Sequence, residues 1–269
     1  MYNQYYNLLE SPFNVTSDPS FFFPSLHHQE AYAHLQYGIQ SRKGIIVLTG
    51  EVGTGKTTIC RTWLSRLDYS TKTAFILNPN FSELQLQQLI NKDFGLTHKS
   101  NNKLDLIDTL NQFLIEESTR GNNVVIIIDE AQNLNARQLE QIRLLSNLET
   151  EKQKLLQIVL VGQPELLDKL KLPQLRQLNQ RVAVRYHILP LSKQEVKQYI
   201  LHRLHVAQAD QELQFSEKSF ETIFIFTHGS PRLINILCDR ALLAGFTKET
   251  RTINEDLINQ CAREVQHIL

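Results

Sequence analysis

Strand-like and helical patterns alternate along the first 190 residues of the chain. Consecutive apolar and mostly β-branched residues predict strands covered on both faces at Ile45–Thr49, Val124–Ile128 and Gln157–Val161. Weaker patterns predict strands at Thr73–Leu77 and Val182–Ile188. Helical patterns fill the segments between them, so the sequence predicts a three-layer α/β fold with a parallel sheet.

After Pro190 strand-like patterns become scarce. Apolar residues at helical spacing form four stripes, which begin at Val196, Phe220, Leu233 and Leu257. Ser230 followed by Pro231 predicts the start of the third helix, because proline fits the first turn of a helix. We therefore predict two domains: an αβα core over residues 1–190 and a small α-helical domain over residues 191–269.

Capping residues predict where several helices begin. Ser82 and Ser192 each open a capping-box pattern, in which two side chains bond to each other's backbone N–H groups. Amphipathic spacing predicts a helix over Lys103–Thr119, and a further helix is expected over Asn135–Leu148.

Composition changes this picture little. The chain has 269 residues with 28 basic and 28 acidic side chains, so its formal net charge is zero. A net charge of zero counts against DNA binding by the whole surface, but it does not exclude binding by a local basic patch. The three cysteines (Cys60, Cys238 and Cys261) form no C-x-x-C pair, which argues against a zinc site or a redox dithiol and favours an intracellular protein.

Targeting signals are not evident in the sequence. The N-terminal stretch Met1–Tyr6 lacks the basic and apolar regions of a signal peptide. The apolar runs of the chain are also far shorter than the roughly 18 residues that span a bilayer. We therefore expect a cytoplasmic protein with no membrane span of its own.

A complete phosphate-loop pattern, G-x-x-x-x-G-K-[ST], follows the first predicted strand. It comprises Gly50, Glu51, Val52, Gly53, Thr54, Gly55, Lys56 and Thr57, and Thr58 comes next. The glycines let backbone N–H groups close around phosphate oxygens at the N-terminus of the following helix. Lys56 is expected to reach the β- and γ-phosphates, and the Thr57 hydroxyl is expected to ligate Mg²⁺.

A second motif is the strand Val124–Ile128 followed by Asp129 and Glu130. An acid at the carboxyl end of a central strand lies beside the phosphates, so Asp129 is expected to coordinate Mg²⁺. Glu130 is the candidate general base, which would activate the water that attacks the γ-phosphorus. The two motifs together predict a nucleoside triphosphatase that uses Mg²⁺, most simply an ATPase once a GTPase is set aside below.

Two other kinds of phosphate-loop enzyme fit less well. A GTPase would carry the motif N-K-x-D, and the nearest sequence, Asn91-Lys92-Asp93-Phe94, has the wrong spacing and lies on a predicted helix. A small-molecule kinase stays open. A glutamate directly after the strand-end aspartate nevertheless suits water activation better than phosphoryl transfer to an acceptor.

Four further polar residues are candidates for sensing the nucleotide. Gln163 follows the strand Gln157–Val161 and can lie between the attacking water and the γ-phosphate. Arg181 and Arg185 bracket the start of the last strand, and an arginine near a subunit edge can reach a neighbour's γ-phosphate; Arg181 is preferred. Arg232 lies in the first turn of a predicted helix, where its positive charge interacts unfavourably with the helix dipole. An arginine at this position is easier to explain if it points at an anion.

These motifs together resemble the AAA+ ATPases, in particular the ExeA-like ATPases of the general secretion pathway protein A family. The resemblance covers essentially the whole chain. It rests on Tyr5-Tyr6-Asn7-Leu8, Ser11-Pro12-Phe13, Asp18-Pro19-Ser20-Phe21-Phe22, His28-Gln29-Glu30-Ala31, the phosphate loop, Ile128-Asp129-Glu130-Ala131-Gln132, Val161-Gly162-Gln163-Pro164-Glu165-Leu166, Gln180-Arg181, Arg185-Tyr186-His187 and Gly229-Ser230-Pro231-Arg232. The Pro-Phe, Gly-Gln-Pro-Glu-Leu and Arg-Tyr-His strings are its more specific parts.

The resemblance implies a nucleotide-binding core followed by a helical lid. It also implies a homo-oligomer, such as a hexamer or a nucleotide-dependent assembly. An adenine pocket is implied near Pro12, Phe13 and residues 28–31. The implied sensing roles are sensor 1 at Gln163, an arginine finger at Arg181 and sensor 2 at Arg232.

Three functions are compatible with these features. Members of the family work in secretin assembly, pilus biogenesis and exopolysaccharide export, and longer members continue into a membrane span and a peptidoglycan-binding region. The first hypothesis is therefore an ATP-hydrolysing assembly factor for an envelope system, held at the inner membrane by a protein partner. The second is a DNA-associated ATPase of transposition or replication, similar to the more distant TniB and MuB proteins. The third is a nucleotide-gated switch with slow or no hydrolysis, against which Glu130 argues.

Overall fold

The computed structural model describes residues 1–77, 79, 81–97, 102–151 and 153–266 of the chain. The chain divides into two units. One unit comprises residues 29–51 and 59–188 and is called the sheet unit, because it contains the large β-sheet. The other comprises residues 1–28, 52–58 and 189–269 and is called the helical unit.

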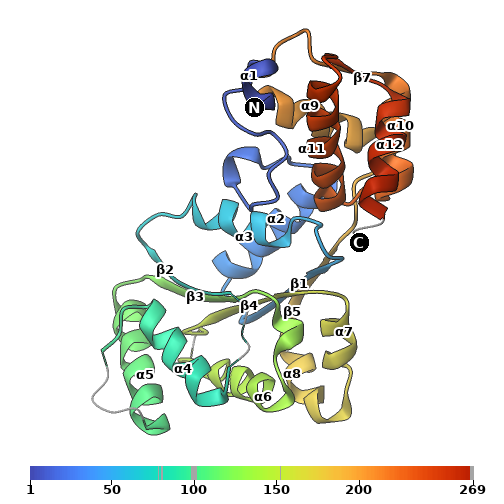
Figure 1. The fold of residues 1–269 in the computed structure, drawn as a ribbon. Helices are drawn as coiled ribbons and strands as arrows, with labels where there is room; N and C mark the ends of the chain where they lie inside the picture. The colour runs from blue at the N-terminus through green and yellow to red at the C-terminus, as the bar shows by residue number, and fades with distance from the viewer. Residues whose placement is uncertain (78, 80, 98–101, 152, 267–269) are drawn as a thin grey trace. The chain divides into compact units, whose positions relative to one another are not determined.

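Five parallel strands in the order β2-β3-β4-β1-β5 form the sheet (Figure 1). Their bounds are β1 Ile45–Gly50, β2 Thr71–Ile76, β3 Asn123–Ile128, β4 Gln157–Gly162 and β5 Val182–Ile188. The register aligns Thr49 with Gly162 and Ile128 with Leu160, so the strands end at one edge of the sheet. The parallel sheet expected from the sequence is confirmed.

Helices cover both faces of this sheet (Figure 1). On one face lie α4 (Glu83–Asp93), α5 (Lys103–Thr119) and α6 (Ala136–Leu145). On the other face lie α2 (Leu26–Gln40) and α3 (Lys56–Leu64). Gly38 lets α2 approach closely, because a Cβ at this position would lie 2.6 Å from Cδ1 of Ile46. The three-layer α/β class is therefore confirmed.

Several helices in both units start at residues whose side chains cap them. Ser82 opens α4 and Ser192 opens α9 (Lys193–Val206), each with a complete capping box, as predicted. Asn135 and Gln138 form a third capping box at the start of α6. Three short helices connect β4 to β5: α7 (Glu165–Leu170), the 3₁₀ helix η3 (Pro173–Leu175) and α8 (Arg176–Arg181).

Four longer helices form most of the helical unit, as the sequence predicted. They are α9, α10 (Glu217–Thr227), α11 (Pro231–Thr247) and α12 (Glu255–Gln266). Pro231 occupies the first position of α11, and Oδ1 of Asn254 caps α12 by accepting from the backbone N–H of Leu257 at 3.0 Å. Two short strands pair in parallel: β6 (Gln214–Phe215) and β7 (Thr252–Ile253).

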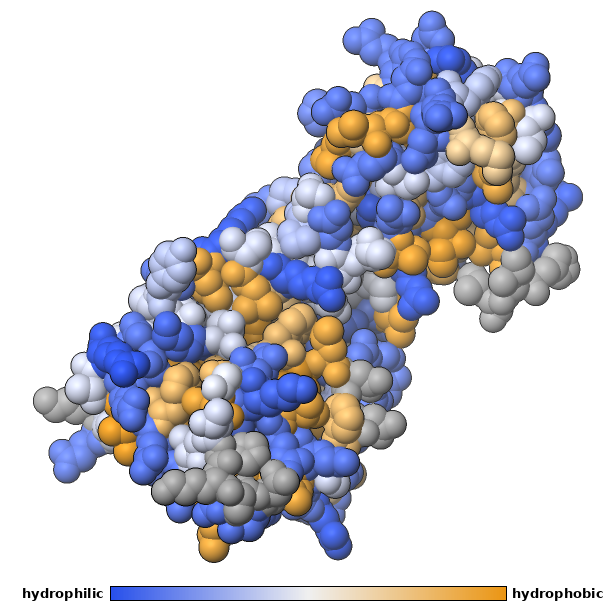
Figure 2. Space-filling view, turned by 60° about the vertical axis from the view of Figure 1, so that its left-hand side comes forward, coloured by the Kyte–Doolittle hydropathy of each residue, from blue (hydrophilic) through white to orange (hydrophobic). Residues whose placement is uncertain are grey.

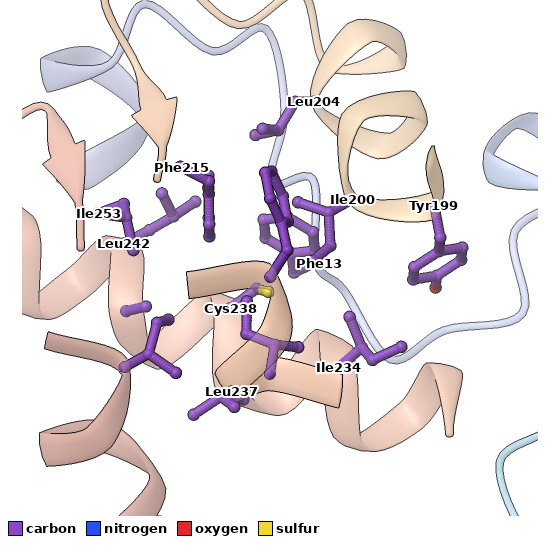
Figure 3. Packing of buried hydrophobic residues seen from close by; sticks show 14 of the residues in the cluster. Phe13, Tyr199, Ile200, Leu204, Phe215, Ile234, Leu237, Cys238, Leu242 and Ile253 are labelled. Carbon is purple, nitrogen blue, oxygen red and sulfur yellow. The ribbon is translucent and has the colours of Figure 1, made fainter. Parts of the chain in front are cut away.

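The N-terminal segment packs against these helices. It contains the short helices α1 (Tyr2–Tyr5) and η1 (Pro19–Phe21). The Tyr6 side chain is buried, and its hydroxyl lies 3.1 Å from the carbonyl oxygens of Leu242 and Thr250. The ring of Phe13 lies 6.4 Å from that of Phe215, in the interior of the unit (Figure 3). The segment thus contributes directly to the hydrophobic core of the helical unit.

Surface apolar residues are scattered. On the face seen in Figure 2, they lie in patches separated by hydrophilic side chains. Such patches are ordinary, because more than half of a folded protein's surface is contributed by apolar atoms. Across the described ranges, no helix combines the length and the apolar character needed to cross a lipid bilayer.

Candidate functional site

The carboxyl edge of the sheet carries polar residues singled out from the sequence. β1 ends at Gly50, the first residue of the phosphate loop, while Asp129 directly follows β3 and Gln163 directly follows β4. Because parallel strands end at one edge, the start of the loop and both side chains lie there. Asp129 is only 2% exposed. Its charge adds to the raised pKa of the Cys60 thiol in α3, for which burial is the main cause.

Glu130 has a backbone conformation that is unusual for a glutamate. Its φ of 53° and ψ of 37° fall in the left-handed region, which L-residues with large side chains rarely adopt. Its N–H donates to Oδ1 of Asp129 at 2.9 Å. Its carboxylate Oε2 accepts from Nε2 of Gln163 at 3.3 Å and from Nε2 of Gln132 at 2.5 Å. The structure therefore brings the candidate base together with the candidate sensor Gln163.

Gln132 is a member of this group to which the sequence motifs assign no role. It lies in the 3₁₀ turn η2 (Ala131–Asn133), two residues after Glu130. Its Oε1 accepts from the backbone N–H of Gln163 at 3.0 Å. The only signal in the sequence is an amide side chain two positions after the candidate base. In this segment the two side chains meet because the backbone turns after Glu130, and no local pattern specifies that turn.

The central part of the phosphate loop, residues 52–58, belongs to the helical unit. Gly53 has a φ of 79° and Gly55 a φ of 88°, in the left-handed region that glycine adopts without strain. Helix α3 begins at Lys56, and the N-terminus of a helix is a common binding site for an anion. Thr54 and Lys56 are buried, with 1% and 6% of their surfaces exposed.

The N-terminus of α11 lies against this loop. The backbone N–H of Arg232 donates to the carbonyl oxygen of Gly53 at 3.3 Å. A Cβ at Gly53 would lie 2.4 Å from Cβ of Arg232 and 3.2 Å from Oγ of Ser230. Only glycine permits such a close approach. The structure therefore brings Arg232, the sensor candidate of the predicted lid, next to the phosphate loop, with an exposed side chain.

His28 contacts the same loop through its imidazole ring. Its Nε2 lies 2.9 Å from the carbonyl oxygen of Thr54, and its Nδ1 lies 2.5 Å from Oγ of Ser25. A carbonyl oxygen only accepts, so Nε2 carries the proton and the Ser25 hydroxyl donates to Nδ1. Burial lowers the pKa of His28, which favours this neutral form. A Cβ at Gly55 would lie 3.0 Å from Nε2, a tight contact from which the ring would have to shift.

A pocket within the helical unit lies beside the loop. Its lining includes Phe21, Phe22, His28, Gly55, Thr58, Tyr199 and Arg203. The Arg203 guanidinium is buried over the ring of Phe21, 4.6 Å from its centroid, and donates to the Tyr199 hydroxyl at 2.9 Å. The lining therefore combines aromatic faces with hydrogen-bonding side chains beside the phosphate loop.

Pro12 and Phe13, which the resemblance places near adenine, have other neighbours in the structure. The carbonyl oxygen of Pro12 accepts a hydrogen bond from Nε of Arg203. Phe13 is 1% exposed and lies in the core of the helical unit. Among the described residues, neither lines the pocket beside the loop, whereas His28 does. A contact of Pro12 or Phe13 with adenine stays a prediction.

Comparison with known proteins agrees with these motifs. The sequence profile of a family described as "AAA domain" matches residues 39–170. General secretion pathway protein A of Aeromonas hydrophila is 45% identical over 269 residues, which are 100% of this chain and 49% of that protein. By its AAA domain and this whole-chain identity, the chain is similar to the AAA+ proteins of the general secretion pathway protein A type. It spans about half the length of that relative, as the 49% coverage shows.

Solved structures share the fold of this AAA+ chain at low sequence identity. Cdc6p of Pyrobaculum aerophilum matches with a TM-score of 0.69 and 19% identity, over 92% of this chain and 71% of its own. The ORC2 protein of Aeropyrum pernix, in ADPNP–ADP complexes, matches with a TM-score of 0.67 and 16% identity, over 91% and 71%. The RuvB motor of Thermotoga maritima matches with a TM-score of 0.58 and 18% identity, over 87% and 68%. At these identities the likeness shows the fold alone.

The two arginine-finger candidates of the AAA+ chain differ in their partners. Nη2 of Arg185 donates to the carbonyl oxygen of Asn179 at 2.8 Å and to its Oδ1 at 2.6 Å. Arg181 is the last residue of α8 and is exposed. Within the described ranges, its side chain makes no hydrogen bond or ion pair. Arg181 is therefore better placed than Arg185 to reach another subunit, and this role stays a prediction.

Proposed function

We propose that this AAA+ chain binds ATP with Mg²⁺ and hydrolyses it to ADP and phosphate. The observation that best supports hydrolysis is the Glu130 carboxylate, which two amide donors orient at the carboxyl edge of the sheet. A switch that only binds nucleotide does not require an oriented carboxylate after the strand-end aspartate. The arrangement therefore favours turnover over the slow nucleotide-gated switch.

Each site residue has a proposed part in the reaction. Backbone N–H groups of the phosphate loop would hold the β- and γ-phosphates, and Lys56 would stabilise the charge that develops on them. Glu130 would accept a proton from the water as the water attacks the γ-phosphorus, and ADP would leave. Gln163 would orient this water or a γ-phosphate oxygen. Arg232 would contact the γ-phosphate from the lid, and Arg181 would contact that of a neighbouring subunit.

Thr57 and Asp129 are the proposed ligands of Mg²⁺. A hydroxyl and a carboxylate supply oxygen donors, which Mg²⁺ prefers. Asp129 is 2% exposed, and a buried carboxylate is stabilised by a nearby cation. When bound, Mg²⁺ would neutralise negative charge on the β- and γ-phosphates. The choice of ATP over GTP rests on the family resemblance and on the missing N-K-x-D motif.

Two substitutions separate binding from turnover. Lys56→Ala is expected to abolish binding of a fluorescent ATP analogue. Glu130→Gln is expected to bind it normally but to release phosphate about 10²- to 10⁴-fold more slowly, the usual contribution of a general base. Unchanged affinity in Lys56→Ala would refute the phosphate-loop assignment, and normal turnover in Glu130→Gln would remove Glu130 as the base. Faster turnover of GTP than of ATP would refute ATP as the substrate.

The cellular role that we propose is assembly of a secretion, pilus or polysaccharide-export system of the envelope. It is supported by the 45% identity to General secretion pathway protein A. The protein would act as a homo-oligomer on the cytoplasmic side of the inner membrane, through a protein of the envelope machinery. Light scattering of Glu130→Gln with ATP tests the assembly, which a monomer at all concentrations would refute. Tight DNA binding whose salt slope is about −0.9 per phosphate contact would favour the DNA-associated alternative.

A further inference from the structure

We propose, on the basis of the ATPase function above, that Gln132 is a positioning residue that orients the Glu130 carboxylate. Gln132 lies in the sheet unit together with Glu130 and Gln163, and its amide touches both of them. Its hydrogen bonds join the turn after β3 to the end of β4. Gln132 would act through Glu130 rather than on the nucleotide.

The hydrogen bonds of Gln132 fix which way its amide points. Its Oε1 lies 3.0 Å from the backbone nitrogen of Gln163, which only donates. Its Nε2 lies 2.5 Å from Oε2 of Glu130, which as a carboxylate only accepts. Flipping the amide would break both bonds. A side chain that both accepts and donates is therefore needed here, and glutamine has the length to do both.

The Glu130 carboxylate is consequently held by one of its two oxygens. Nε2 of Gln163 donates to the same Oε2 that Gln132 contacts, at 3.3 Å. In the part of the chain that the structure describes, no hydrogen bond reaches Oε1. The terminal torsion of a free glutamate is broad, so two donors on Oε2 restrict the plane of the carboxylate. Oε1 is then the oxygen presented to accept a proton from water.

Neighbouring residues hold the turn of Gln132 through its backbone. Lys169 of α7 donates through Nζ to the carbonyl oxygens of Gln132 at 2.5 Å and Leu134 at 2.7 Å. Gly162 leaves room for the amide, because a Cβ there would lie 2.8 Å from Oε1 of Gln132. Because Lys169 binds carbonyl groups, the turn does not depend on the Gln132 amide. Substitutions of that amide can therefore be tested in a folded protein.

Gln132→Glu is the sharpest test. It keeps the size of the side chain and an acceptor for the N–H of Gln163, but it replaces the donor to Glu130 with an oxygen that repels the carboxylate. We expect kcat for ATP to fall about 10²-fold, the effect of a misplaced catalytic group. We expect KM and the affinity for ATP to change by less than about twofold, because nothing in the binding of the ground state is removed. Gln132→Met, which lacks both bonds but adds no charge, is expected to lower kcat by a smaller factor.

Two further variants separate an effect on the position of the Glu130 carboxylate from an effect on the stability of the fold. Gln141→Glu makes the same change at a buried glutamine of α6, whose Nε2 donates to Oε1 of Gln87 at 3.0 Å. It is expected to lower the thermal midpoint and to leave kcat per folded molecule unchanged. The double variant Glu130→Gln/Gln132→Glu exchanges the donor and the acceptor. Repulsion between the two carboxylates is expected to lower the thermal midpoint of Gln132→Glu, and the double variant is expected to recover that midpoint without recovering turnover.

The possible outcomes distinguish the positioning role of Gln132 from the proposed ATPase function. Wild-type kcat in both Gln132 variants, with Glu130→Gln inactive, would overturn the positioning role and leave the ATPase function intact. An equal loss of kcat in Gln132→Glu and Gln141→Glu, or a raised KM at unchanged kcat, would overturn it as well. If the wild-type protein turns over no ATP, the proposed function fails and the role of Gln132 fails with it.

Discussion

Gly53→Ala tests the close approach of the phosphate loop to α11. Gly53 has a φ of 79°, and an L-residue in this region costs about 1–2 kcal/mol. The added Cβ would also lie 2.4 Å from Cβ of Arg232, an atom that cannot move without its backbone. Overpacking of this kind costs about 1–3 kcal/mol. We therefore expect a loss of about 2–5 kcal/mol in the free energy of unfolding.

Two controls divide this loss into its parts. Gly121 has a φ of 81°, but an added Cβ would meet nothing within 4 Å. Gly121→Ala is therefore expected to show the backbone cost alone, about 1–2 kcal/mol. Arg232→Gly removes the Cβ that Gly53→Ala would strike. In the double variant Gly53→Ala/Arg232→Gly the two effects are expected to be non-additive by about 1–3 kcal/mol, in the direction of rescue.

The assay is urea unfolding followed by circular dichroism, with titration of a fluorescent ATP analogue alongside. Midpoints are compared only among variants that share the slope of the wild type, since a changed slope signals a changed unfolding reaction. Gly53→Ala is expected to weaken nucleotide binding, because the loop or the start of α11 must shift. Equal losses in Gly53→Ala and Gly121→Ala, or strict additivity with Arg232→Gly, would show that the loop does not press on α11.

Two further predictions concern pH and the neighbouring subunit. Burial lowers the pKa of His28, so below about pH 6.5 the unfolded chain binds more protons than the folded one, and stability falls as the pH drops. His28→Gln keeps a donor for the carbonyl of Thr54 without titrating, so its thermal midpoint is expected to fall less between about pH 8 and pH 5, and an identical fall would contradict the assignment. Arg181→Ala is expected to lose ATP turnover by itself and to regain part of it when mixed with Glu130→Gln subunits. The same mixing with Arg185→Ala shows which arginine acts, and failure of Arg181→Ala at every ratio would argue against its action on a neighbouring subunit.

The parts of the fold that could be predicted from the sequence are those specified locally. The strand Val124–Ile128 is visible because a buried parallel strand needs consecutive apolar residues, and the structure places β3 over Asn123–Ile128. The start of α4 is visible because Ser82 offers a capping box that is present in the structure. Gln163 could be singled out for the same kind of reason, since a residue directly after a parallel strand lies at the carboxyl edge of the sheet.

Packing between distant segments could not be predicted in this way. The Tyr6 hydroxyl donates hydrogen bonds to the carbonyl oxygens of Leu242 and Thr250, which lie more than 230 residues further along the chain. No periodicity of the sequence encodes such a contact. His28 is similar. Its sequence neighbours say only that it opens a helix, whereas its ring bonds to Thr54 in the phosphate loop. The contribution of the N-terminal segment to the helical unit depends on such pairs.

Gln132 shows why a motif identifies a base without showing what holds it. Glu130 can be identified from the order of residues alone, because it follows a predicted strand and the aspartate at its end. The orientation of its carboxylate depends on the left-handed backbone at Glu130 and on two amides, one of which is tied to the end of β4. A glutamine in a 3₁₀ turn has no preferred partner until the neighbouring strand supplies an N–H that only donates. The chemistry of the site therefore depends on a pairing between β3 and β4 that the motif alone does not contain.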